Sequence, residues 1–153
     1  MMRTDPFVGV VEYRDSFNLR MADIPGLIDG ASEGKGKGHD FLRHLERTKA
    51  LLYIVDAAGT EGRDPLQDLK ILANELASYG SGDMMNRRAL VVANKLDLLD
   101  EQEQAEIISK LERAAQEMGI QMHGQALGIG AGVTGLGLAS LSQAMRTIVQ
   151  STD

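Results

Sequence analysis

The chain has 153 residues, the length of one ordinary domain with a core of normal size. Its hydrophobic fraction of 43% and charged fraction of 25% are typical of a globular protein, and the absence of cysteine excludes a disulfide scaffold and a thiolate metal site. The net charge of −6 argues against general affinity for nucleic acid, and no apolar run approaches the roughly 20 residues that span a bilayer. The N-terminus lacks a signal-peptide pattern. Basic residues do gather locally, at Lys35, Lys37, Arg43, Arg47 and Lys49.

Two apolar runs open the chain, at residues 7–13 and 17–22. Three residues separate them, a connection short enough for an antiparallel hairpin. Residues 25–38 hold five glycines, which predicts a loop that is mobile unless a ligand orders it. From Asp40 to Thr48 apolar residues recur at helical spacing, so this stretch predicts a helix.

Residues 50–55 form a continuous apolar run that ends at Asp56, which is typical of a strand buried on both faces of a parallel sheet. Asp64 and Pro65 predict the start of a helix, because aspartate caps a first turn and proline fits within it. The apolar stripe of that helix is Leu66, Leu69, Leu72, Ala73, Leu76 and Tyr79.

Strand and helix patterns alternate through the rest of the chain. We expect a loop at 80–86, a strand at 89–93, a helix at 101–118, a less regular strand at 120–129 and a last helix at 138–149. A hairpin followed by alternating helices and strands predicts an α/β layered domain with a mostly parallel sheet.

Two short motifs follow predicted strands, where open α/β sheets bind ligands. They are Asp23-Ile24-Pro25-Gly26 and Asn94-Lys95-Leu96-Asp97. In the first, the carboxylate suits a metal-bound water and the glycine lets a backbone N–H approach a phosphate oxygen. In the second, the aspartate can accept from two N–H groups on the guanine edge, and the lysine stem can cover the ring. Each motif alone also arises by chance, but their order and setting indicate a guanine-nucleotide pocket.

Other nucleotide and metal sites fit less well. The segment Gly30–Gly36 is one residue short of a P-loop, and Gly36 stands where serine or threonine must reach Mg²⁺. The segment Gly130–Gly135 matches the dinucleotide fingerprint, which needs a further strand with an acidic residue about 20 positions on, but the sequence ends at Asp153. The three histidines lack metal-pair spacing and are interpreted as structural.

The segments ADIPGLIDGA, GKGHDFLRHLERTKALLYIVDAAG, RDPLQDLKILANEL and VVANKLDL resemble the GTPase domain of the Obg family. The resemblance runs from about Gly9 to Leu98, its FLRHLERT segment is specific to that family, and it returns at residues 133–138, similar to the last guanine-contacting loop. It implies a P-loop-GTPase-like three-layer fold. It also implies a switch that binds GTP or GDP with Mg²⁺ and assists ribosome assembly, in bacteria, mitochondria or chloroplasts.

The resemblance also implies the roles of single residues. Phosphate and Mg²⁺ contacts fall on residues 23–26, with Asp23 as the metal ligand, and base contacts fall on Asn94, Lys95 and Asp97. In the last loop, Ala131 and Gly132 replace the family's Ser-Ala. The base is then expected to meet a backbone N–H but to lose the support of the serine.

The sequence departs from the family pattern at its start. The family's P-loop lies upstream of the segment where this chain begins, and Arg3 occupies the place of a Mg²⁺-binding threonine. We therefore expect a partial G domain, in which the central strand and the P-loop helix are missing. Its parts are a hairpin and motif strand at 1–23, a switch-like loop at 24–38 and the remainder at 39–153. We also expect both motifs at one rim of the sheet, with an open cleft beside Asp23.

Two functions follow from this pattern. The first is a slow GTPase, whose GTP and GDP states order or release the loop at 25–38 and so change the surface that a ribosomal particle meets. The second is a non-enzymatic module derived from a GTPase, which binds a ribosomal or protein partner without turning over nucleotide. Because the P-loop is absent from these 153 residues, we expect this chain alone to be inactive as an enzyme. An α/β domain unrelated to nucleotides is disfavoured by the two motifs in the right order.

Overall fold

The computed structural model describes residues 8–22, 47–78, 83–130 and 134–151. The strands are β1 (Val8–Glu12), β2 (Asn18–Ala22), β3 (Ala50–Asp56), β4 (Arg88–Asn94), β5 (Gln121–Met122) and β6 (Leu127–Gly128). The α-helices of these ranges are α2 (Pro65–Ala77), α3 (Glu101–Glu117) and α4 (Leu138–Ser151), and short 3-10 helices are η2 (Thr60–Gly62), η3 (Asp83–Asn86) and η4 (Leu96–Leu98). The predicted fold class, an α/β domain with a parallel sheet and an N-terminal antiparallel hairpin, is confirmed.

Strand β4 is the centre of the larger sheet. Strands β3, β5 and β6 all pair with it in parallel, and β3 pairs along its whole length, from Ala50 opposite Arg88 to Asp56 opposite Asn94. The predicted strand at 120–129 is wrong as one element, because Gly124 turns the chain with a φ of +82° between β5 and β6. Between these strands, the N–H of Ala126 donates over 3.1 Å to the side chain of Glu112 in α3, and not to a neighbouring strand.

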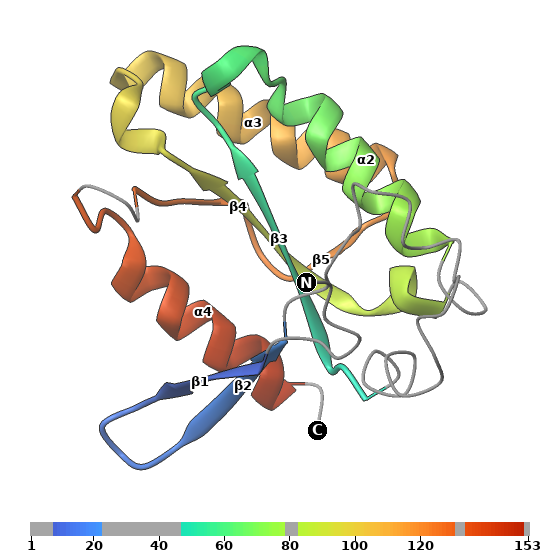
Figure 1. Cartoon of the computed structure of the whole chain (residues 1–153), viewed down its shortest axis with the longest axis vertical. Coiled ribbons are helices and arrows are strands. Elements are labelled where there is room, and N and C mark those ends of the chain that lie inside the picture. Colours follow the sequence, from blue (N-terminus) through green and yellow to red (C-terminus); the bar gives the residue numbers. More distant parts are fainter. Residues whose placement is uncertain (1–7, 23–46, 79–82, 131–133, 152–153) are drawn as a thin grey trace, which may run out of the picture.

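Two apolar cores explain why β3 and β4 are hydrophobic on both faces. Side chains that alternate along β4, at Ala89, Val91 and Ala93, pack in the core shared with α2 and α3. The intervening Leu90 and Val92 pack in a second core with α4 and the β1–β2 hairpin. Figure 1 shows α2 and α3 together on one side of β3 and β4, with α4 and the hairpin on the other. The layered arrangement therefore follows from the period-two alternation of apolar side chains along these strands.

Capping residues fix where the helices on the first face begin. Asp64 accepts a hydrogen bond from the Leu66 N–H over 3.0 Å, with Pro65 as the first residue of α2, as the sequence predicts. Helix α3 begins with a capping box, in which Asp100 accepts from the Glu103 N–H and Glu103 accepts from the Asp100 N–H. These caps set the position of the loops that precede the helices.

Several expectations fall outside the described residues: the motif at 23–26, the loop at 25–38, the helix from Asp40 and the cleft beside Asp23. In the ranges that are described, β2 pairs with β1 and β3 pairs with β4, and no ladder joins the hairpin to the larger sheet. No helix in these ranges combines the length and the apolar character needed to cross a membrane.

Candidate functional site

The carboxyl ends of β3 and β4 lie side by side. Asp56, the last residue of β3, is the register partner of Asn94, the last residue of β4. The N–H of Ala57 donates to the Asn94 carbonyl over 2.9 Å, so the two chains remain tied where they leave the sheet. Ligands of open parallel sheets bind at this end of the strands. The polar residues that follow β3 and β4 therefore share one edge.

The chain turns sharply after β4. Asn94 Oδ1 accepts from the Lys95 N–H over 2.8 Å, and Lys95 has a left-handed φ of +60°, which is uncommon for a residue with a side chain. Leu96 is buried, and its N–H donates to the Ile129 carbonyl over 2.9 Å. A Cβ at position 128 would overlap the Leu96 side chain, so Gly128 permits this packing. The turn that carries the motif is thus anchored by both a hydrogen bond and a buried leucine.

The carboxylate of Asp97 lies against the loop that follows β6. The Thr134 hydroxyl donates to Asp97 Oδ2 over 3.3 Å. A Cβ at Gly130 would stand only 2.7 Å from Asp97 Oδ1, so a residue with a side chain at this position would clash with the carboxylate. The loop is closed by the Gly135 N–H, which donates to the Gly130 carbonyl over 2.8 Å. Thr134 thus brings a hydroxyl to the Asp97 carboxylate, whereas positions 131 and 132, where the loss of the serine is predicted, lie outside the described residues.

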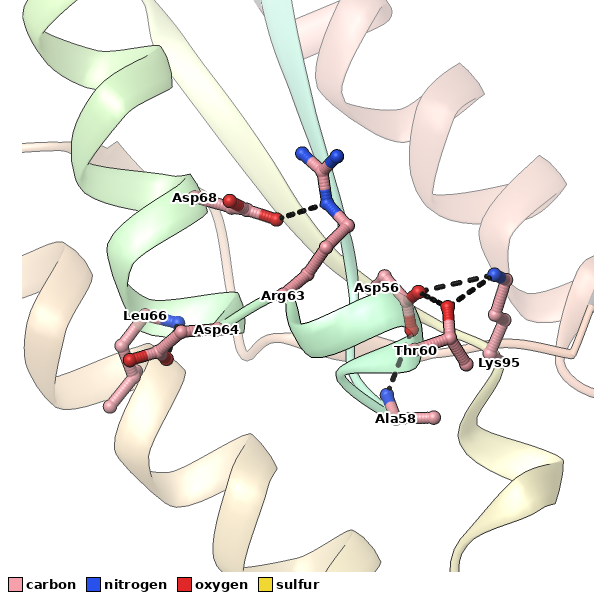
Figure 2. A network of polar contacts seen from close by, with 8 residues as sticks. All are labelled: Asp56, Ala58, Thr60, Arg63, Asp64, Leu66, Asp68 and Lys95. Atoms are coloured by element: carbon pink, nitrogen blue, oxygen red, sulfur yellow. Dashed lines mark hydrogen bonds and ion pairs between the residues drawn. The ribbon is translucent and has the colours of Figure 1, made fainter.

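The ammonium of Lys95 is held away from the turn by two partners (Figure 2). Its Nζ donates to Asp56 Oδ2 over 3.1 Å and to the Thr60 hydroxyl over 2.9 Å. The Thr60 hydroxyl in turn donates to the same Asp56 oxygen, and the other oxygen, Oδ1, accepts from the Ala58 N–H over 3.0 Å. These contacts join the end of β3, the helix η2 and the turn after β4 in one network.

The charge state of Asp56 follows from these contacts. Partial burial raises the pKa of its carboxyl, but the hydrogen bonds from Thr60 and Lys95, the positive charge of Lys95 and the Ala58 N–H together lower the pKa below its ordinary value. Asp56 is therefore ionised at neutral pH. Its side chain is 13% exposed, whereas that of Lys95 is 46% exposed, so the lysine reaches from an open surface toward a sheltered carboxylate.

The predicted site residues divide into two groups. Asn94, Lys95 and Asp97 come together at the carboxyl edge of β4, beside Gly130 and Thr134. The remaining predicted residues, Asp23, Ile24, Pro25, Gly26, Ala131 and Gly132, lie outside the described residues. Within the described ranges, no group of three or more histidine, aspartate or glutamate side chains is arranged to hold a metal ion.

Three residues of the site were not identified from the sequence. Thr134 carried a detectable signal, because it is the single hydroxyl residue between Leu127 and Gly137. Asp56 carried a weaker one, as the charged residue that closes an apolar run. Thr60 carried none, since it approaches Asp56 only through the turn that the left-handed Gly59 makes.

Comparison with known proteins identifies the family of this chain. The family model described as "50S ribosome-binding GTPase" matches residues 4–95. GTPase Obg of Lachnoclostridium phytofermentans is 42% identical over 144 residues, which are 94% of this chain and 33% of that protein. GTPase Obg of Symbiobacterium thermophilum is 51% identical over 98 residues, which are 64% of this chain and 23% of that protein. The chain therefore spans a third or less of the length of these relatives.

A solved structure shares the fold. The crystal structure of a bacterial selenocysteine-specific elongation factor, EF-Sec, superposes with a TM-score of 0.64 over 96% of this chain and 22% of its own, at 16% identity. At that identity the likeness concerns the fold alone. The family model covers the hairpin, β3, α2 and β4. The chain belongs to the Obg family of 50S ribosome-binding GTPases.

Proposed function

We propose that the edge formed by residues 94–97 and the loop after β6 recognises the base of a guanine nucleotide. The observation that carries the proposal is the Asp97 carboxylate, held between the Gly130 backbone and the Thr134 hydroxyl. Guanine presents two adjacent N–H donors on one edge, and a carboxylate offers two acceptor oxygens to match them. Adenine lacks that donor pair. Membership of a GTPase family supports the same assignment.

The rest of the nucleotide site is proposed on residues that lie outside the described ranges. The backbone of Ala131 and Gly132 is adjacent to Gly130 and would offer an N–H to the base. Asp23 would hold the Mg²⁺ ion through a water, and the remaining motif residues Ile24, Pro25 and Gly26 would line the γ-phosphate. In this assignment the domain divides at 1–23, 24–38 and 39–153, as expected from the sequence.

We further propose that the complete protein hydrolyses GTP to GDP with Mg²⁺ and acts in ribosome assembly. The description of the matching family, which names binding to the 50S subunit, supports this role, as do the relatives named GTPase Obg. Cosedimentation of the chain with purified large ribosomal subunits tests the partner. Binding that differs between the GDP state and the state with a non-hydrolysable GTP analogue would support the switch. No binding in either state would contradict the proposed ribosomal partner.

Calorimetric titration with GDP and ADP tests the base assignment. We expect the chain to bind GDP about tenfold or more tightly than ADP. Asp97→Asn should weaken GDP and favour xanthosine diphosphate, because an amide can donate to the carbonyl that xanthine carries in place of the guanine amino group. The matched control is Asp100→Asn, which removes a nearby charge but keeps a good helix cap. Equal affinities of the unchanged chain for GDP and ADP would refute the proposal.

A further inference from the structure

The Asp56, Thr60 and Lys95 network contains more hydrogen bonds than a surface ion pair needs. Lys95 Nζ donates to both partners, and Asp56 uses both of its oxygens. Thr60 accepts from the lysine and donates to the aspartate, so each side chain contacts the other two. A lysine side chain that is 46% exposed is ordinarily free to change rotamer, whereas this one is fixed at its far end.

The local sequence brings Thr60 to this position. Gly59 has a left-handed φ of +64°, and its N–H donates to the Asp56 carbonyl over 3.2 Å, which closes a tight turn after β3. A Cβ at position 59 would stand 2.8 Å from the Arg63 carbonyl oxygen, so the turn requires glycine. Arg63 then pairs with Asp68 of α2 over 2.9 Å. The hydroxyl of Thr60 is therefore presented from a segment that is anchored to both β3 and α2.

The lysine backbone is fixed as well. Lys95 leaves β4 in the left-handed region, one residue after the register partner of Asp56. Both ends of the side chain are thus set by neighbouring strand ends: the Cα by β4 and the ammonium by the end of β3. The methylene stem between them must run across the edge of the sheet, beside the turn that carries Asp97.

We infer that Asp56 and Thr60 are positioning residues of the guanine site, which hold the Lys95 ammonium so that its methylene stem forms a preset wall for the base. This inference rests on the proposed function. Fixing the stem before the ligand arrives removes an ordering cost from binding, so the tether raises affinity without touching the nucleotide. The effect concerns the base and not the phosphates.

Substitutions at Thr60 separate positioning from folding. Thr60→Val keeps the shape and removes the hydroxyl, and we expect it to weaken GDP about fivefold, the factor that one net hydrogen bond corresponds to. Guanosine should lose the same factor, since the tether acts on the base. Thr60→Ser keeps the hydroxyl and should restore affinity to within about twofold. Arg63→Gln is the control, because it releases the same segment from α2 without removing a partner of Lys95.

A second measurement reports on the tether without nucleotide. In a chain with ¹³C-labelled lysine, the Cε signal of Lys95 is assigned by its loss in Lys95→Arg, and it should show restricted motion. Thr60→Val and Asp56→Asn should increase that motion. Thr60→Ser and Arg63→Gln should leave it restricted. A mobile Lys95 in the unchanged chain would overturn the inference. The inference would also be overturned if Thr60→Val bound GDP as tightly as the unchanged chain. In that case a preference for GDP over ADP would still support the proposed function. If the unchanged chain showed no preference for GDP, both would fall.

Discussion

The Thr134 hydroxyl donates to Asp97 Oδ2 over 3.3 Å, although 37 residues separate the two in the sequence. Thr134 also contacts the loop that presents it, since its Oγ1 accepts from the Leu136 N–H over 3.2 Å. The residue therefore links the carboxylate to the closed loop that begins at Gly130. The resemblance to the Obg family predicts a serine at position 131, where this chain has alanine. Three positions later, Thr134 brings a hydroxyl to the Asp97 carboxylate.

Removing that hydroxyl should loosen Asp97. We expect Thr134→Val to weaken GDP about threefold to fivefold, because a net hydrogen bond to a charged group is lost while the volume of the side chain is kept. The measurement is calorimetric titration with GDP. Thr147→Val is the matched control, since the Thr147 hydroxyl bonds only within α4, to the Gln143 carbonyl, among the described contacts. Equal losses in the two variants would mean that the Thr134 contact does not support the site.

A methyl group at position 130 should be more damaging. In Gly130→Ala the new Cβ would lie 2.7 Å from the Asp97 carboxylate and 2.9 Å from Thr134 Oγ1, so Asp97 must move. We expect GDP affinity to fall about tenfold or more, since the loss includes the match to both guanine donors. Thermal unfolding should change little, because Gly130 does not have a positive φ.

Gly124→Ala gives the opposite pattern and serves as the comparison. Gly124 has a φ of +82° with open space around its hypothetical Cβ, so alanine there strains the backbone without contacting the site. We expect a loss of about 1–2 kcal/mol in the free energy of unfolding and no change in GDP affinity. If Gly130→Ala also lost stability and kept its affinity, the close approach to Asp97 would not matter for binding.

The sequence predicted most of the fold because the decisive signals are local. The apolar run before Asp56 predicted a strand of a parallel sheet, and β3 is one, although in the described ranges it pairs only with β4. Asp64 and Pro65 predicted the start of α2 correctly. The strand at 120–129 was wrong as one element, because Gly124 turns the chain with a φ of +82°, and the long-range bond between Ala126 and Glu112 of α3 then holds the segment between β5 and β6. Tertiary context overrides a weak local pattern there.

The candidate site was predictable only where a motif marks it. Asn94, Lys95 and Asp97 follow a strand, and the carboxyl edge of a strand is where a ligand is expected. Asp56 and Thr60 join them through a parallel register and a glycine turn, neither of which a linear pattern encodes. Thr134 reaches Asp97 through the loop after β6, a contact between residues 37 positions apart that a linear pattern does not encode.

Hydrogen exchange should distinguish β3 from β4. Strand β4 pairs with β3 along its whole length and with β5 and β6 at residues 88–89 and 92–93 of its other edge, so most of its amides should exchange slowly. In the described ranges β3 pairs only with β4, and in a parallel ladder alternate N–H groups point to opposite edges. We therefore expect every second amide between Leu51 and Val55 to exchange quickly. Uniformly slow exchange in β3 would show that another segment pairs with its second edge.

A second cluster holds the N-terminal hairpin to the last helix. The Arg146 guanidinium donates to both oxygens of Asp15, over 2.9 and 2.6 Å, and its Cζ lies 4.4 Å from the centre of the Phe17 ring. The Tyr13 hydroxyl donates to the Ser142 carbonyl over 2.6 Å. A bidentate pair that also stacks on an aromatic ring suits arginine and not lysine. The turn of the hairpin is thus fixed to α4 by contacts that span most of the described chain.

This pair should contribute stability that depends on pH. The hydrogen bonds from Arg146, with its positive charge and the Phe17 N–H, outweigh partial desolvation and lower the pKa of Asp15 below its ordinary value of 3.8. A carboxyl with a lowered pKa in the folded state stabilises the fold above its unfolded pKa. That contribution is lost as the pH falls through the lower, folded value. The contribution should therefore be full near neutral pH and decline progressively below pH 3.8.

A double-mutant cycle isolates that contribution. Asp15→Asn and Arg146→Met, alone and together, give the coupling between the two side chains from urea unfolding at each pH. We expect a favourable coupling at neutral pH and low salt, because Asp15 is 57% exposed and its pairing is sensitive to screening. It should shrink as the pH is lowered past 3.8 and vanish once Asp15 is protonated in the folded chain. Arg146→Lys should retain only part of the coupling, since the ammonium cannot form the bidentate pair. A coupling that stayed constant down to acidic pH would mean that the Asp15 charge does not contribute to it. A coupling of zero at neutral pH would mean that the aromatic contacts of Arg146 hold the hairpin to α4 without the ion pair.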